Sequence, residues 1–132
     1  FWGPYALIRA GQPAVKVICG GQAAAAEKFS RAVAAQCGVV LPVETAAAPP
    51  AGGEPALIFT CRGDALAAQA AALDKDGAIT ARYPGPGAYV VLPLGEAARP
   101  QIVVFGGDAQ GLEQGAANLA KFLRSENGWG ID

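Results

Sequence analysis

The stretch Pro100–Arg124, PQIVVFGGDAQGLEQGAANLAKFLR, decides the fold of this chain. Four apolar residues, Ile102–Phe105, lead into Gly106, Gly107 and Asp108, and an amphipathic segment follows directly. This order predicts a buried strand, a tight turn and a helix capped by Asp108. A strand that feeds a helix through a glycine-rich turn either cradles a phosphate group or serves only packing.

The glycine-rich turn departs from the known phosphate-binding patterns. A dinucleotide fingerprint requires the order GxGxxG, whereas residues 106–111 read GGDAQG, so the second glycine is misplaced. Asp108 also puts a negative charge where a pyrophosphate group would lie. The chain has no Walker A sequence, GK followed by Ser or Thr. A small nucleotide-binding domain that uses Gly107 is therefore the weakest of the three functions considered for this chain.

The packing interpretation explains each conspicuous residue of this segment. Gly111 and Gly115 are four residues apart, so they share one helical face and allow the helix to approach its sheet closely. Asp108 caps the helix and suits its positive end. An apolar stripe continues along the same helix through Leu112, Ala116, Leu119, Phe122 and Leu123.

The first half of the chain predicts a hairpin, a helix and a strand. Tyr5–Ala10 and Ala14–Cys19 are strand candidates on either side of a Gly-Gln-Pro turn, so we expect them to pair as a β-hairpin. Gln22–Cys37 has the apolar spacing of a helix, and Gly38 is suited to end it. Val39–Val43 is the next predicted strand, interrupted by Pro42.

The second half of the chain again alternates predicted strands and helices, and this order predicts the fold class. Ala56–Cys61 is expected to be a buried strand, followed by a helix over Ala65–Leu73 with Asp64 as its N-cap. Ala78–Tyr83 and Ala88–Leu94 are predicted to form a second hairpin around a Pro-Gly-Pro-Gly turn. Strands interleaved with helices and hairpins indicate an α/β (α+β) domain over residues 1–132. Its mixed sheet should carry two or three helices packed mainly on one face.

Composition excludes several classes of function. A length of 132 residues suits one domain with a substantial core. The net charge is −1 and the ten Lys and Arg residues are scattered, which argues against nucleic acid as a partner. No apolar run approaches the length of about 20 residues that a membrane span needs. The aromatic start, Phe1-Trp2, without a Met suggests that the sequence begins inside a longer polypeptide.

Histidine and cysteine usage restricts the chemistry. The chain has no His, so Ser-His or Cys-His catalysis and a His-containing zinc site are excluded within it. Cys19, Cys37 and Cys61 stand in apolar surroundings without CxxC spacing, which favours buried, reduced side chains; one disulfide with a leftover thiol is the alternative. We predict no metal and no cofactor.

No side-chain constellation predicts catalysis. Asp74 and Asp76 occupy a predicted turn, and Glu44 and Glu54 border a Pro/Gly-rich loop, where solvated carboxylates are ordinary. We therefore assign no catalytic residue.

The aromatic residues offer one candidate ligand site and one candidate interface. Tyr83 and Tyr89 flank the predicted turn at residues 84–87 and are candidates for a sugar-stacking platform, although aromatic residues of hairpins more often pack together. Trp129 is a candidate interface anchor.

Together these segments resemble a known accessory domain. The strand and turn, Asp108, Gly111-Leu112, Gly115 and the ending Phe122-Leu123 are similar to the last strand and helix of the non-catalytic N-terminal domain of family 20 β-hexosaminidases, α-glucuronidases and related glycoside hydrolases. The resemblance extends over residues 5–124, although Ala116 stands where the family often has an aromatic residue. Further similar segments are Ala23–Gly38, Val39–Val43, Ala56–Cys61 and Gly87–Val90.

The resemblance implies a non-catalytic role within a larger protein. In that family the catalytic carboxylates belong to a following (β/α)₈ barrel, so the implied partner is a catalytic barrel domain of the same polypeptide, at an extracytoplasmic (periplasmic or secreted) location. The expected function is an accessory or interaction domain of a carbohydrate-active protein. A carbohydrate-binding module that depends on Tyr83 or Tyr89 is the main alternative.

Overall fold

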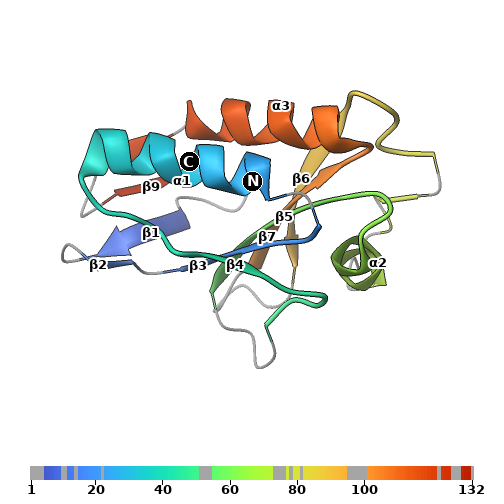
Figure 1. Ribbon diagram of the computed structural model, residues 1–132, viewed down its shortest axis with the longest axis horizontal. Coiled ribbons are helices and arrows are strands. Elements are labelled where there is room, and N and C mark those ends of the chain that lie inside the picture. The colour runs from blue at the N-terminus through green and yellow to red at the C-terminus, as the bar shows by residue number, and fades with distance from the viewer. Residues whose placement is uncertain are drawn as a thin grey trace.

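A computed structural model describes residues 5–9, 12–13, 15–21, 23–50, 55–72, 77, 79–80, 82–94, 101–121, 123–125 and 129–131. Within these residues the chain forms three helices and two sheets (Figure 1). The helices are α1 (Ala24–Cys37), α2 (Ala65–Ala72) and α3 (Ala109–Ala120). The strands are β1 (Tyr5–Arg9), β2 (Gln12–Pro13), β3 (Lys16–Cys19), β4 (Val43–Thr45), β5 (Ala56–Cys61), β6 (Tyr89–Leu94), β7 (Gln101–Gly106), β8 (Leu123–Ser125) and β9 (Trp129–Ile131).

The larger sheet has the strand order β4-β3-β5-β7-β6. Strands β4, β3, β5 and β7 run parallel, and β6 pairs with β7 in the antiparallel direction. Every residue of β5 and β7 is buried, as expected of central parallel strands covered on both faces. The predicted α/β class with a mixed sheet is confirmed.

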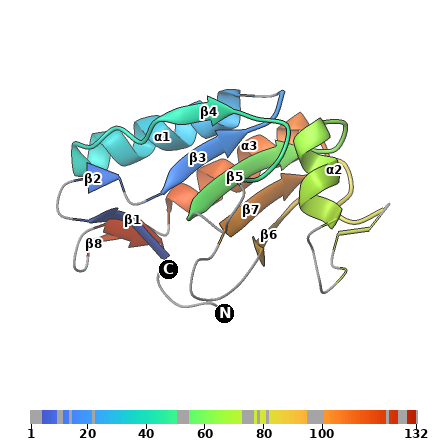
Figure 2. The ribbon, with the colours of Figure 1, turned by 90° about the horizontal axis from the view of Figure 1, so that it is seen from below.

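Helices cover both faces of this sheet, two on one face and one on the other. Helices α1 and α3 lie side by side over the face that carries Leu57, Phe59 and Val104 (Figure 1). Helix α2 packs through Leu66 and Ala70 on the opposite face, which Figure 2 shows from the α2 side, with α1 and α3 behind the strands. The predicted helices therefore lie mainly on one face, and α2 is the exception.

The first predicted hairpin was wrong in its pairing. Strand β1 pairs with the two-residue strand β2 and with β9, and these form a second sheet of order β2-β1-β9-β8. Strand β3 instead joins the centre of the larger sheet. The reason is burial: Val17, Ile18 and Cys19 are all buried, so both faces of β3 need cover that a two-stranded hairpin does not provide.

The second predicted hairpin was also wrong, although β6 itself was predicted correctly. The partner of β6 is β7, and residues 79, 80, 82 and 83 lie in no strand. The hydroxyl oxygen of Thr80 accepts hydrogen bonds from the backbone N–H groups of Arg82 and Tyr83, at 3.3 and 3.0 Å. Such side-chain bonds to nearby backbone groups compete with the pairing of a strand.

Single residues set the end of α1 and the start of the strand that follows it. Gly38 ends the helix with φ at 75°, the left-handed conformation that favours glycine, as predicted. The next strand begins at Val43 rather than Val39, because Pro42 has no N–H group to donate to a neighbouring strand. Residues 39–42 instead form a connection held by the hydroxyl of Ser30, which donates to the carbonyl of Leu41 at 2.6 Å.

Candidate functional site

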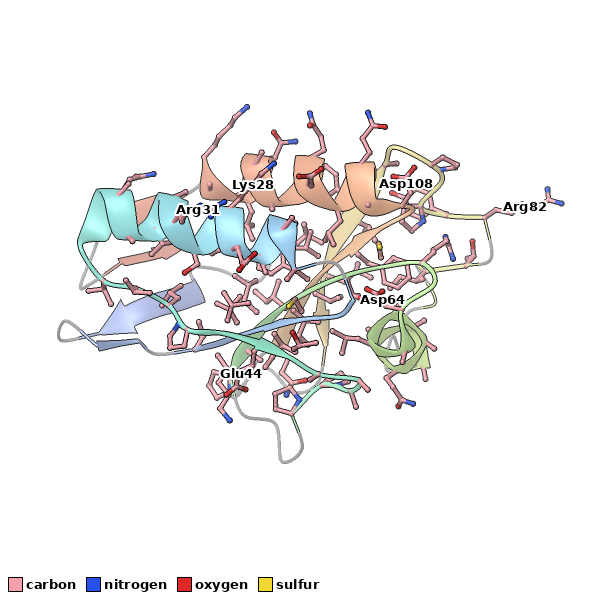
Figure 3. The ribbon with its side chains drawn as sticks, viewed as in Figure 1. Lys28, Arg31, Glu44, Asp64, Arg82 and Asp108 are labelled. Atoms are coloured by element: carbon pink, nitrogen blue, oxygen red, sulfur yellow. The ribbon has the colours of Figure 1, made fainter. Side chains whose placement is uncertain are left out.

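The carboxyl ends of β3, β5 and β7 meet at one edge of the larger sheet. Ligands of open α/β sheets bind beyond the carboxyl ends of parallel strands, so this edge is the place to look for a site. We call it the carboxyl edge. It consists of Gly20 after β3, of Cys61–Asp64 at the end of β5, of Gly106–Asp108 at the end of β7, and of the loop that precedes β6, described at residues 79–80 and 82–88. Figure 3 shows Asp64 and Asp108 at this end of the molecule.

The turn between β7 and α3 is filled by the backbone of the neighbouring loop. The N–H group of Gly107 donates to the carbonyl of Ala88 at 2.9 Å. A Cβ atom at Gly107 would overlap the carbonyl oxygen of Gly85 and lie 2.8 Å from that of Pro84. Protein carbonyl groups therefore occupy the space that a bound phosphate would need.

The start of α3 follows the prediction. The Oδ1 atom of Asp108 accepts a hydrogen bond from the N–H group of Gly111 at 2.8 Å, which is an N-cap contact. A Cβ atom at Gly111 would overlap the carbonyl oxygen of Ala88, and one at Gly115 would lie 2.7 Å from Cγ1 of Val104. Gly115 thus allows the close approach of helix and sheet that was predicted from the spacing of the glycines, whereas Gly111 allows α3 to approach the loop before β6.

Asp64 lies directly before α2, at the predicted N-cap position, and its carbonyl accepts a hydrogen bond from the N–H group of Ala68 at 3.4 Å. Its Oδ2 atom accepts hydrogen bonds from the hydroxyl of Thr60 at 3.1 Å and from the N–H group of Cys61 at 3.4 Å. The carboxylate lies against Gly20, where a Cβ atom would overlap it. The side chain therefore binds two donors at the end of β5, the strand that precedes it in the sequence.

The Cys61 thiol at this edge is a poor nucleophile. Cys19 and Cys61 are buried and reduced, and the side chain of Cys37 lies outside the described residues. Burial raises the pKa of the Cys61 thiol above its ordinary value of 9.0, and the negative charges of Asp64 and Asp108 raise it further. A thiol with a raised pKa carries little thiolate at neutral pH and reacts slowly.

Arg62 ties the loop before β6 to the sheet, and sequence reasoning missed it. Its guanidinium group donates to the carbonyl of Pro84 at 3.1 Å and to that of Thr80 at 2.5 Å. The same group lies over the ring of Phe105, 5.5 Å from the ring centroid. The available signal was a charged residue placed directly after the apolar run of β5.

The predicted aromatic candidates lie in different surroundings. Tyr89 is half-buried: its ring atoms approach Gly115 of α3, and its hydroxyl accepts a hydrogen bond from Nδ2 of Asn118 at 2.8 Å. Tyr83 is 53% exposed on the loop before β6. Trp129 belongs to β9, where its backbone pairs with Ile8 and Ser125, and its side chain lies outside the described residues.

Of the remaining carboxylate candidates, the structure describes Glu44. Glu44 is exposed on β4, apart from Asp64 and Asp108 (Figure 3), whereas Asp74, Asp76 and Glu54 lie outside the described residues. Among the side chains that the structure describes, no cluster of His, Cys, Asp and Glu residues is arranged to hold a metal ion. None of the described helices is long and apolar enough to cross a membrane.

No protein-family model and no curated protein sequence matches this chain. The similarity to the accessory domain of glycoside hydrolases therefore stays a prediction from the sequence.

Proposed function

We propose that this chain is a non-catalytic accessory domain of a larger carbohydrate-active protein, and that it acts by packing against other parts of that protein. The observation that carries the proposal is the filled turn between β7 and α3. The carbonyl groups of Gly85 and Ala88 occupy the place where a nucleotide phosphate would bind in a catalytic or cofactor-binding α/β domain.

The polar side chains of the carboxyl edge support the same proposal because they make hydrogen bonds within the fold. Asp108 caps α3, Asp64 accepts hydrogen bonds from the end of β5, and Arg62 holds the loop before β6. Catalytic acids and bases need instead to face a substrate within hydrogen-bond reach. The raised pKa of the buried Cys61 thiol argues further against nucleophilic catalysis here.

The carbohydrate-active parent rests on the resemblance described above. The same resemblance supports a catalytic barrel domain as the partner within one polypeptide and an extracytoplasmic location.

The deciding experiment is the mass of the native polypeptide, measured by immunoblot of source cells with an antibody to this domain. A band much larger than 13.3 kDa is expected. A band near 13 kDa would contradict the accessory role.

Carbohydrate binding is the second candidate, and the exposure of Tyr83 favours it. An exposed aromatic ring offers a face on which a sugar ring can stack. Saturable binding of glycans that is lost in Tyr83→Ala and kept in Val40→Ala, a change at another exposed apolar side chain, would support this alternative.

A further inference from the structure

Strand β6 forms one edge of the larger sheet, and this edge is apolar. The strand reads YVVLPL, without a charged residue, and the side chains of residues 89–92 are each half-buried. The opposite edge strand, β4, has only three residues and carries the exposed Glu44. Short length and charge keep an edge strand from pairing with another chain, and β6 has neither.

Alternate residues of β6 turn their backbone groups toward the open edge. The carbonyl of Ala88 accepts a hydrogen bond from the N–H group of Gly107, so the backbone of residue 88 faces β7. The antiparallel register gives residues 90, 92 and 94 the same orientation. The N–H and C=O groups of Tyr89 and Val91 therefore point away from β7. Among the residues that the structure describes, none forms a hydrogen bond with these outward groups.

A second copy of β6 matches the donors and acceptors of this edge. When two copies pair in the antiparallel direction about a two-fold axis at Val91, the two Val91 residues exchange both of their hydrogen bonds. The N–H group of Tyr89 then meets the carbonyl of Pro93 in the other copy. Pro93 has no N–H group, so the only backbone acceptor that this register leaves to water is the carbonyl of Tyr89.

The same register matches the side chains on both faces of the sheet. Tyr89 and Val91 pack with the core under α1 and α3, whereas Val90 and Leu92 pack with the core under α2. Across the axis Val91 lies opposite Val91, and Val90 lies opposite Leu92. Apolar side chains therefore meet on each face, and no charge is brought near another.

We propose that two copies of this chain associate through β6, in the antiparallel register centred on Val91, and so form one continuous sheet. The partner is a strand that adds to the edge, and β6 itself has the uncharged sequence and the outward groups that this edge requires. Such a dimer does not depend on the accessory role, because a native mass near 13 kDa would contradict that role and leave the dimer possible.

The first test is the mass of the intact polypeptide in solution. Sedimentation equilibrium over about 1–1,000 μM should show monomers in equilibrium with dimers. Val91→Glu places two like charges opposite each other at the axis and should raise the Kd of the dimer at least about tenfold. The matched control is Val43→Glu, because Val43 is a half-buried valine of the other edge strand that packs on the same face. It should leave this Kd unchanged.

The second test fixes the register by cross-linking. Hydrogen-bonded residues of an antiparallel pair have Cα atoms about 5.5 Å apart, which a disulfide can span. Oxidation of Val91→Cys with glutathione disulfide should therefore link two copies. The yield should be at least about tenfold above that of Val43→Cys and of the unmodified protein.

The remaining outcomes overturn the proposed dimer. A polypeptide that stays monomeric over the whole range does so, and slow exchange of the Val91 amide in that monomer would show that another segment covers β6. A dimer that Val91→Glu and Val43→Glu weaken equally has its contact elsewhere, and so does a dimer that Val91→Cys fails to link. If Val91→Glu does not fold, the cross-linking yield decides.

Discussion

Asn118 of α3 donates a hydrogen bond of 2.8 Å to the hydroxyl oxygen of Tyr89 on β6. The bond joins the last helix to the edge strand of the sheet, across the position where Gly115 lets the tyrosine ring lie against the helix. Tyr89 therefore has a structural role that separates it from Tyr83.

Replacing Tyr89 with Phe should lower the free energy of unfolding by about 0.5–1.5 kcal/mol, since the Asn118 amide loses a partner in a partly buried place. The matched change Tyr83→Phe should stay within about 0.5 kcal/mol of the unmodified protein, because the side chain is exposed. Urea unfolding measures both. Equal losses in the two variants would show that the assignment of these roles is wrong.

The close approach at Gly111 should make alanine harmful there, even though alanine is the better helix former by about 1 kcal/mol. The added methyl group meets the backbone carbonyl of Ala88, which cannot rotate away, so we expect a net loss of about 1–3 kcal/mol. Gly115→Ala meets the side chains of Val104 and Tyr89, which can adjust, and should cost less than Gly111→Ala. Gln114→Ala, on the exposed face of α3, is the control. Stabilisation by Gly111→Ala would contradict the observed approach.

Arg62 should control the order of the loop before β6. Arg62→Ala leaves the carbonyls of Thr80 and Pro84 without this donor, and we expect a loss of about 1–3 kcal/mol together with faster hydrogen exchange over residues 82–88. Arg62→Lys should recover only part of the loss, because an ammonium group cannot reproduce the planar fork of a guanidinium.

The control is Arg82→Ala, which removes an exposed arginine of the same loop. This variant should leave the rate of hydrogen exchange over residues 82–88 unchanged. If the backbone amides of the loop before β6 exchange at the normal rate in Arg62→Ala, contacts other than those of Arg62 hold this loop.

The Cys61 thiol should make the domain less stable at alkaline pH. Its pKa is raised in the folded protein by burial and by Asp64 and Asp108, so the unfolded chain loses the thiol proton first as the pH rises. The contribution is fully present below the ordinary value of 9.0 and is lost as the pH rises through the folded pKa. Unfolding in urea at several pH values should show a smaller decline above pH 9 for Cys61→Ala than for the unmodified protein. Parallel declines would argue against the raised pKa.

Features set by neighbours in the sequence were predictable, and features set by distant partners were not. The Asp108 cap and the helix end at Gly38 depend on local backbone geometry, and both were predicted. The pairing of β6 with β7 and of β1 with β9 depends on which apolar faces need cover, and adjacent strand candidates were wrongly paired as hairpins.

The candidate site was predictable only in part, for the same reason. Tyr83 and Tyr89 were identified by type, but their different exposure follows from the position of α3. Arg62 and Thr80 are 18 residues apart, and no short motif joins them.

The position of β7 in the sheet has a consequence for the order of events during synthesis. Strand β7 lies between β5 and β6, and its residues 101–106 pair with both neighbours. Until the ribosome has released these residues, β6 lacks its partner, and the apolar side chains of β5 lie on an open edge. Productive folding is therefore expected to wait for residues 101–106, and a nascent chain stalled before β7 should be a target for chaperones.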